Sequence, residues 1–179
     1  MKKKVQLMDE LGVKRALTRL SYEIVEKSDD PANIVLVGIK TRGISMARII
    51  RKNIEANIGI QLPLCELDIS FYRDDRPQAD SPQVQPCHFD IDITGKEVII
   101  IDDVLYTGRT IRAAIEAIFS QGRAGKIGLC VLIDRGHREL PIRPDYIGKN
   151  VPTSQKEKIV VSFAEIDGVT DVSLYERED

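Results

Sequence analysis

Short apolar runs alternate with longer amphipathic stretches along most of the chain. Residues 98–101 read Val-Ile-Ile-Ile, a pattern typical of a strand that is buried on both faces of a parallel sheet. Comparable runs predict further strands at 33–37, 62–69, 126–133 and 158–163. Such runs favour a sheet that is covered on both faces.

The amphipathic stretches predict helices between these strands. The first helix is expected to begin after Asp9, as its N-cap, and to run to about residue 27. Its buried stripe, at spacings of three and four, is Val13, Leu17, Leu20 and Ile24. A second helix is expected over 44–57 with a stop at Gly59, and a third after Thr110 with a stop at Gly122. Strands that alternate with helices predict an α/β fold with a mostly parallel, doubly wound sheet, in one domain over 1–179.

Two segments interrupt this alternation. Residues 70–88 form a polar tract with three prolines and no periodicity. A loop of this length inside a compact domain is usually functional or disordered. Residues 134–155 are also rich in proline and charge, and no element is predicted there.

Composition narrows the class of protein. The formal net charge of −2 argues against sequence-independent binding to nucleic acid, although a local basic face remains open. Basic residues do crowd the first twenty positions: Lys2, Lys3, Lys4, Lys14, Arg15 and Arg19. No apolar run approaches the roughly 20 residues of a membrane span, and the charged start does not read as a signal peptide. We therefore expect a cytoplasmic protein.

The three cysteines have no Cys-x-x-Cys spacing. Cys65 and Cys130 lie in apolar runs and are expected to be buried thiols. Cys87 beside His88 lacks the further ligands that a metal site requires, so the pair is read as incidental.

The chemistry of the chain is concentrated at 98–110. Asp102 and Asp103 follow the buried strand, and a turn with Thr107, Gly108 and Thr110 then leads into a helical pattern. Backbone N–H groups and the positive end of a helix suit a phosphate, whereas paired carboxylates suit ribose hydroxyls or a divalent metal. One ligand with both parts is a phosphorylated sugar. The alternative is a plain strand, turn and helix cap; neither a P-loop nor a dinucleotide-binding glycine motif is present.

Residues 98–110 closely resemble the thirteen-residue motif of type I phosphoribosyltransferases, which use 5-phosphoribosyl 1-pyrophosphate (PRPP). The resemblance implies a single-domain type I phosphoribosyltransferase fold: a mostly parallel central sheet flanked by helices, a small hood and a flexible catalytic loop. The hood would comprise roughly 135–157 plus C-terminal residues, and the loop roughly 70–88.

Three further segments fit the same chemistry. Residues 38–43, Gly-Ile-Lys-Thr-Arg-Gly, resemble the pyrophosphate-binding loop of the family, although alone they would pass for a surface turn. Residues 70–76 resemble its mobile catalytic loop, with Arg73 as the catalytic cation; a solvated charge run is the alternative. Residues 134–136 follow a strand and are placed to touch the base.

The resemblance implies a role for each site residue. Asp102 and Asp103 would grip the ribose hydroxyls and hold Mg²⁺, directly or through water, and with Arg73 they form the catalytic set. Arg135 and Ile159 would contact the base. The residues that bind PRPP or UMP would be Lys40, Thr41, Arg42, Asp102, Asp103, Val104, Leu105, Tyr106, Thr107, Gly108, Arg109 and Thr110. No protein nucleophile is expected, since positioning and charge neutralisation suffice.

Several segments outside the motif resemble one family, the bifunctional pyrimidine operon attenuators with uracil phosphoribosyltransferase activity (the PyrR family). They are 15–20, 37–43, 72–75 and 134–150. This resemblance implies that uracil and PRPP give UMP and pyrophosphate. It also implies UMP-dependent binding to the leader RNA of pyrimidine genes, and a homodimer or larger homo-oligomer. A purine or orotate enzyme is disfavoured by residues 135–143.

The resemblance places RNA contacts on the first helix and on the segment after the base-binding residues. The implied set is Thr18, Arg19, Tyr22, His137, Arg138, Arg143 and Lys149. Members of the family usually have histidine where this chain has Tyr22, which can stack on an unpaired base or donate a hydrogen bond. Residues 134–150 have a surplus of only one positive charge, so a mixed-charge loop, and an enzyme with weak or no RNA regulation, remain the alternatives.

Overall fold

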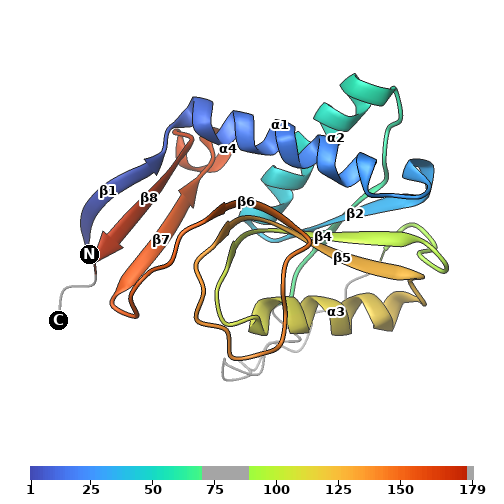
Figure 1. Cartoon of the computed structure of the whole chain (residues 1–179). Coiled ribbons are helices and arrows are strands. Elements are labelled where there is room, and N and C mark those ends of the chain that lie inside the picture. The colour runs from blue at the N-terminus through green and yellow to red at the C-terminus, as the bar shows by residue number, and fades with distance from the viewer. Residues whose placement is uncertain (70–88, 177–179) are drawn as a thin grey trace.

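The computed structural model describes residues 1–69 and 89–176, and its centre is a parallel sheet of five strands (Figure 1). The spatial order is β3 (Leu64–Leu67), β2 (Ile34–Ile39), β4 (Glu97–Leu105), β5 (Lys126–Asp134) and β6 (Tyr146–Asn150). Every neighbouring pair in this order is parallel. β2 is buried along its whole length, as expected for a strand covered on both faces.

Helices cover both faces of this sheet. α1 (Glu10–Glu26) and α2 (Arg42–Ile58) lie on one face and α3 (Arg109–Gln121) lies on the other (Figure 1). The two faces give two apolar clusters, one around Leu20 and Ile50 and the other around Ile111 and Ala114. The predicted α/β fold, with a mostly parallel sheet between helices, is confirmed.

A second sheet joins the two ends of the described chain. It consists of β1 (Lys2–Met8), β8 (Asp171–Glu176) and β7 (Glu157–Ser162), all antiparallel. Two short helical segments complete the fold, η1 (Pro31–Asn33) and α4 (Ala164–Asp167). The sheet stands beside one end of the central sheet, next to the start of α1 (Figure 1).

Helix ends follow the predicted local chemistry. The Asp9 carboxylate accepts a hydrogen bond from the Gly12 amide at 2.7 Å, so Asp9 caps α1 as expected. Gly59 ends α2 with a φ of 70°, in the left-handed region that glycine adopts without strain. α2 and α3 begin two residues earlier than the apolar pattern predicts, at Arg42 and Arg109.

Sequence analysis missed three strands and misplaced the end of a fourth. β1 was missed because it begins with a run of lysines and has no apolar run, and its residues 2–6 are exposed. β8 contains the buried polar residues Asp171 and Ser173, which hydrogen-bond to each other at 2.7 Å. β6 lies within the proline-rich segment and is half exposed. β4 continues through the acidic pair to Leu105, because hydrogen bonding to β5 extends that far.

The expectation for two of the cysteines is also met. Cys65 and Cys130 are both buried, and burial raises the pKa of the Cys130 thiol well above its usual range. No helix within residues 1–69 and 89–176 has the length and apolarity needed to cross a membrane.

The parallel register brings the predicted functional segments to one edge of the sheet. Gly38 pairs with Ile101 across β2 and β4, and Leu105 pairs with Asp134 across β4 and β5. The segments that follow these three strands therefore leave the sheet side by side at its carboxyl edge, where open α/β sheets bind ligands.

Candidate active site

The turn between β2 and α2 lies directly against the acidic end of β4. A Cβ atom on Gly43 would come within 2.5 Å of the Ile101 carbonyl oxygen and 3.3 Å of the Asp102 Cα. Real Cβ atoms do not approach backbone so closely, so only glycine allows the first turn of α2 to take this place. Gly43 thereby puts the predicted pyrophosphate loop beside the predicted ribose site.

Two cations of this loop are paired with acidic residues from elsewhere in the fold. The Lys40 Nζ lies 3.0 Å from an oxygen of Asp68, and the Arg42 Nη2 lies 2.7 Å from an oxygen of Asp167. The Arg42 Nε is buried and donates to no acceptor in the described residues. A buried donor without an acceptor is costly unless a ligand supplies one, so Arg42 fits an anionic ligand.

The acidic pair is partly shielded from water, because Asp102 is buried and Asp103 is half-buried. Asp102 is 7% exposed, and its carboxylate accepts a hydrogen bond from the Asp103 amide at 3.0 Å. Burial raises the pKa of the Asp103 carboxyl, although the Asp102 side chain and the charge of Arg42 act in the opposite direction. A carboxylate that is costly to ionise alone gains from hydroxyl donors or a cation, and both fit a ribose held with a metal.

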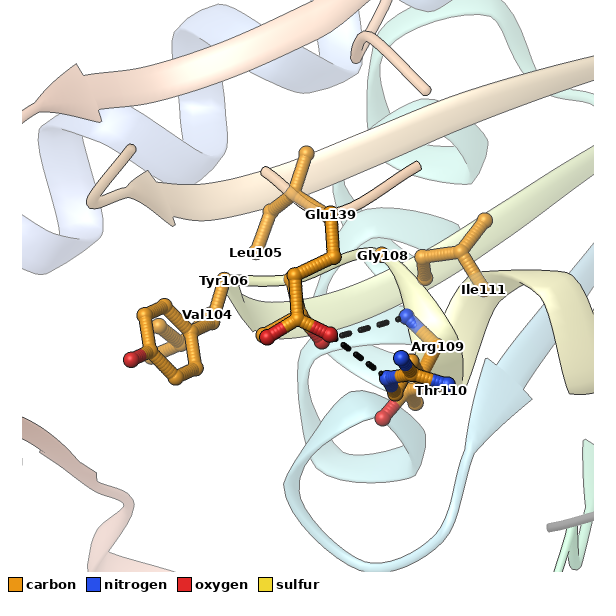
Figure 2. A pocket seen from close by; sticks show the side chains of 9 residues that line it. Val104, Leu105, Tyr106, Gly108, Arg109, Thr110, Ile111 and Glu139 are labelled. Carbon is orange, nitrogen blue, oxygen red and sulfur yellow. Dashed lines mark hydrogen bonds and ion pairs between the residues drawn. The ribbon is translucent and has the colours of Figure 1, made fainter. Parts of the chain in front are cut away.

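The turn after β4 encloses a cavity of about 350 Å³, lined by residues 104–111 and Glu139 (Figure 2). Gly108 precedes α3 with a φ of 95°, and the Arg109 amide donates to the Thr107 Oγ1 at 3.3 Å. The first amides of a helix have no acceptor within the helix and point outward, so this turn can receive a phosphate. The structure thus brings all the predicted phosphate residues, Tyr106 to Thr110, into one cavity.

Arg135, a predicted base-binding residue, is buried and held by the protein. Its Nε donates to the Thr153 Oγ1 at 3.0 Å, and its Nη2 donates to the carbonyls of Ser154 and Glu157 at 3.2 and 2.9 Å. The guanidinium also lies over the Tyr106 ring, 4.0 Å from its centre. Arg135 therefore joins the end of β5 to the segment before β7 and to the phosphate turn.

Ile159, the other predicted base-binding residue, lies on β7 and is only 5% exposed, within the apolar cluster under α1 and α2. Contact of either residue with a base stays a prediction.

The packing of Arg135 carries a stability prediction. Arg135→Lys is expected to lower the free energy of unfolding by about 1–3 kcal/mol, because one ammonium cannot reach the acceptors that the planar guanidinium serves. Urea denaturation measures the change. Arg143→Lys, at an exposed position eight residues away, is the control and is expected to stay within about 0.5 kcal/mol of the original. Equal stability of the two variants would contradict this role of Arg135.

The predicted RNA contacts divide into two groups. Thr18, Arg19 and Tyr22 line a groove of about 500 Å³ along α1. Arg19 donates to the carbonyls of Ile147 and Gly148 at 3.1 and 2.7 Å, which places it beside β6 and near Lys149. Lys149 itself donates to the Leu7 carbonyl at 3.4 Å and lines a neighbouring groove between β1, the start of α1 and β6.

The second group follows β5. His137 is exposed and contacts the Thr153 carbonyl, and Arg143 is exposed. Arg138 points inward instead: it donates to the carbonyls of Tyr106 and Ile142 at 2.9 Å each and pairs with Asp134. Arg138 therefore holds the phosphate turn, and a contact with RNA would be additional to that role.

Some predicted site residues lie outside the described residues, and some ion-pair partners in the site were not predicted. Arg73, the predicted catalytic loop at 70–88, Cys87 and His88 lie outside the described residues. Sequence analysis did not single out Asp68, Asp167 or Glu139, which pair with Lys40, Arg42 and Arg109. Each comes from an element distant in sequence from its partner, so no local pattern marks it.

Comparison with known proteins gives one consistent result. A model of the phosphoribosyl transferase domain matches residues 5–165. The "Bifunctional protein PyrR" of Halalkalibacterium halodurans is 51% identical over 96% of this chain and 97% of its own. The protein of the same name from Clostridium perfringens is 53% identical, over 97% and 98%.

Solved structures agree on the fold. A hypoxanthine-guanine phosphoribosyltransferase from Bacillus anthracis superposes with a TM-score of 0.71 at 20% identity, covering 97% of this chain and 98% of that one. The hypoxanthine phosphoribosyltransferase of Trypanosoma cruzi gives 0.71 at 16% identity, covering 98% of each chain.

Proposed function

We infer the chemistry of this site from the premise that the chain belongs to the phosphoribosyltransferase family and, within it, to the bifunctional PyrR proteins. It is a uracil phosphoribosyltransferase, which makes UMP and pyrophosphate from uracil and PRPP, and a regulator of pyrimidine genes. The observation that supports the assignment of the site is the placement of Asp102 and Asp103 between the Gly43 turn and the phosphate turn.

We propose that the two turns hold the two ends of PRPP. The amides of residues 107–110 and the start of α3 would bind the 5′-phosphate, while Lys40, Thr41 and Arg42 would bind the pyrophosphate. With both ends fixed, the ribose lies over the acidic pair. The anomeric carbon is then positioned for attack without a protein nucleophile.

Asp102 and Asp103 would accept hydrogen bonds from the ribose hydroxyls. Their donor set also fits Mg²⁺, which proteins commonly hold through one or two carboxylates together with substrate phosphates. When bound, Mg²⁺ supplies positive charge to the pyrophosphate and orients the hydroxyls, directly or through water. The two carboxylates would also stabilise positive charge that develops on the sugar.

In the proposed reaction a ring nitrogen of uracil forms a bond to the anomeric carbon as the bond from that carbon to pyrophosphate breaks. The leaving pyrophosphate takes the bonding electron pair, and the proton of the ring nitrogen passes to the pyrophosphate or to water. Arg42, and Arg73 from the segment outside the described residues, would neutralise the leaving group. Arg135 and Ile159 are the proposed neighbours of the base.

A substrate assay tests the enzymatic half. Labelled uracil and PRPP with Mg²⁺ are expected to give labelled UMP and pyrophosphate in equal amounts. Hypoxanthine, guanine and orotate serve as competing bases. A preference for one of those bases would contradict the assignment of uracil.

For the regulatory half we propose that UMP bound at residues 102–110 favours binding of pyrimidine leader RNA. The RNA would lie across the α1 groove of Thr18, Arg19 and Tyr22 and the neighbouring groove of Lys149, together with His137 and Arg143. A homodimer or larger homo-oligomer of this chain would extend that surface.

The RNA surface has its own prediction. Arg19→Gln is expected to weaken leader-RNA binding and to reduce its salt slope by about one, because one cation no longer faces the RNA backbone. Filter binding at several salt concentrations, with and without UMP, measures both quantities. Arg48→Gln is the control, since Arg48 pairs with Glu66 and Glu165 on another surface. Equal effects of the two substitutions, or no specific binding by the original chain, would reject this surface.

A further inference from the structure

Glu139 occupies the mouth of the phosphate cavity. Its Oε2 lies 2.7 Å from the Arg109 Nε, and its side chain lines the same cavity as residues 104–111 (Figure 2). The backbone of this segment is also linked to the turn, because the amides of Glu139 and Leu140 both donate to the Thr107 carbonyl, at 3.0 and 3.2 Å. A carboxylate thus lies on the one arginine of a turn that suits an anion.

A bound phosphate cannot share this position with Glu139. A phosphate monoester carries a charge of about −1.5 to −2 at neutral pH, so its approach to Arg109 brings two anions together. The phosphate also gains hydrogen bonds from the amides of the turn and the start of α3. The ion pair itself is weak, because the side chains of Arg109 and Glu139 are 42% and 52% exposed. Phosphate should therefore displace Glu139 readily and reversibly.

We propose that Glu139 is a resident competitor for the 5′-phosphate, and that its displacement from Arg109 shifts residues 136–142. The inference rests on the proposed assignment of residues 106–110 to the 5′-phosphate. It adds to that assignment that the position of Glu139 depends on whether phosphate occupies the site.

The contacts of residues 136–142 explain how a displacement of Glu139 would reach His137. Arg138 donates to the carbonyls of Tyr106, in the turn, and Ile142, further along the segment. The His137 ring meets the Tyr106 ring edge to face, with centres 6.0 Å apart. Glu139 therefore directly follows two residues, His137 and Arg138, that both contact Tyr106 of the phosphate turn. Nucleotide binding would therefore change the position of His137, which is predicted to contact RNA.

The test compares two ion pairs whose arginines both lie on α3. Glu139→Gln removes the pair at the cavity. Glu116→Gln removes the pair of Arg112 and Glu116, which has a distance of 2.9 Å and exposed fractions of 37% and 57%. Calorimetric titration with UMP is expected to show two- to fivefold tighter binding for Glu139→Gln, from the typical strength of an exposed ion pair. Glu116→Gln is expected to bind UMP as the original chain does.

Nuclear magnetic resonance of the histidine rings tests the shift of the segment. The chain has two histidines, so His88→Gln assigns the His137 signal. UMP is expected to move that signal in the original chain. In Glu139→Gln the signal should already be displaced without UMP and should move less when UMP is added.

The outcomes separate the two levels of the inference. Equal or weaker UMP binding by Glu139→Gln would overturn the competition. Tighter binding with an unchanged His137 response would overturn the shift of residues 136–142. A failure of the original chain to bind UMP would reject the proposed function itself, and this inference with it.

Discussion

Asp103→Asn is expected to lower kcat/KM for UMP formation by about a hundredfold or more, while the protein stays folded and at least as stable as the original. Asparagine keeps the shape of the side chain. It loses the negative charge that would stabilise the developing sugar cation and hold Mg²⁺. The loss should appear mainly in kcat, since the two turns still bind both ends of PRPP.

The stability half of this prediction follows from the raised pKa of Asp103. Below the ordinary pKa of aspartate both folded and unfolded states hold the proton, and the carboxyl costs nothing. As the pH rises through the raised folded pKa, the folded state must ionise a shielded carboxyl and stability is lost. Asparagine is neutral at every pH, so the variant keeps that stability.

Thermal unfolding at several pH values checks the sign. The melting temperature of Asp103→Asn should equal or exceed that of the original at pH 8, and the difference should shrink as the pH falls toward 4. Equal losses of activity and of stability would indicate a structural role for Asp103 and contradict the assignment.

Gly43→Ala is expected to impair both stability and catalysis. The added Cβ would meet the Ile101 carbonyl at 2.5 Å, so the start of α2 or the end of β4 must move. Forcing an extra carbon into packed backbone costs about 1–3 kcal/mol. The same movement separates the pyrophosphate loop from the acidic pair, and a displacement of about 1 Å in a catalytic site can cost a hundredfold in rate.

Gly59→Ala, at the other end of the same helix, is the matched control. A Cβ on Gly59 would meet no atom within 4 Å, but its φ of 70° strains any other residue. We expect a cost of about 1 kcal/mol in stability and an unchanged kcat/KM. Urea denaturation and the uracil assay measure both variants. Retention of full activity by Gly43→Ala would show that the close approach at Gly43 does not position the site.

The sequence predicts the central sheet, apart from its edge strand β6, and the site edge, because their signals are local. β2, β4 and β5 are continuous apolar runs, and the turns after them carry glycines, hydroxyls and charges in order. The resemblance to the family then adds roles that no residue spacing indicates, such as contact with the base and contact with RNA.

The rest depends on contacts between distant residues. β1 and β8 stabilise each other by pairing, and Lys3 lies 3.3 Å from Asp171, so neither strand needs an apolar run of its own. The partners of the site cations, Asp68, Asp167 and Glu139, become visible only once the chain is folded. The inward direction of Arg138 is a further example, because its acceptors are mostly backbone carbonyls that a sequence does not specify.

The pairing of β1 with β8 also sets an order on folding during synthesis. Lys2 pairs with Glu176, so the full antiparallel sheet cannot form on the ribosome until the last described residue has emerged. The parallel sheet needs only residues 34–150 and can begin earlier. Until then β1, the basic strand, is not paired with β8. Pairing between strands so far apart in the sequence is slow to form.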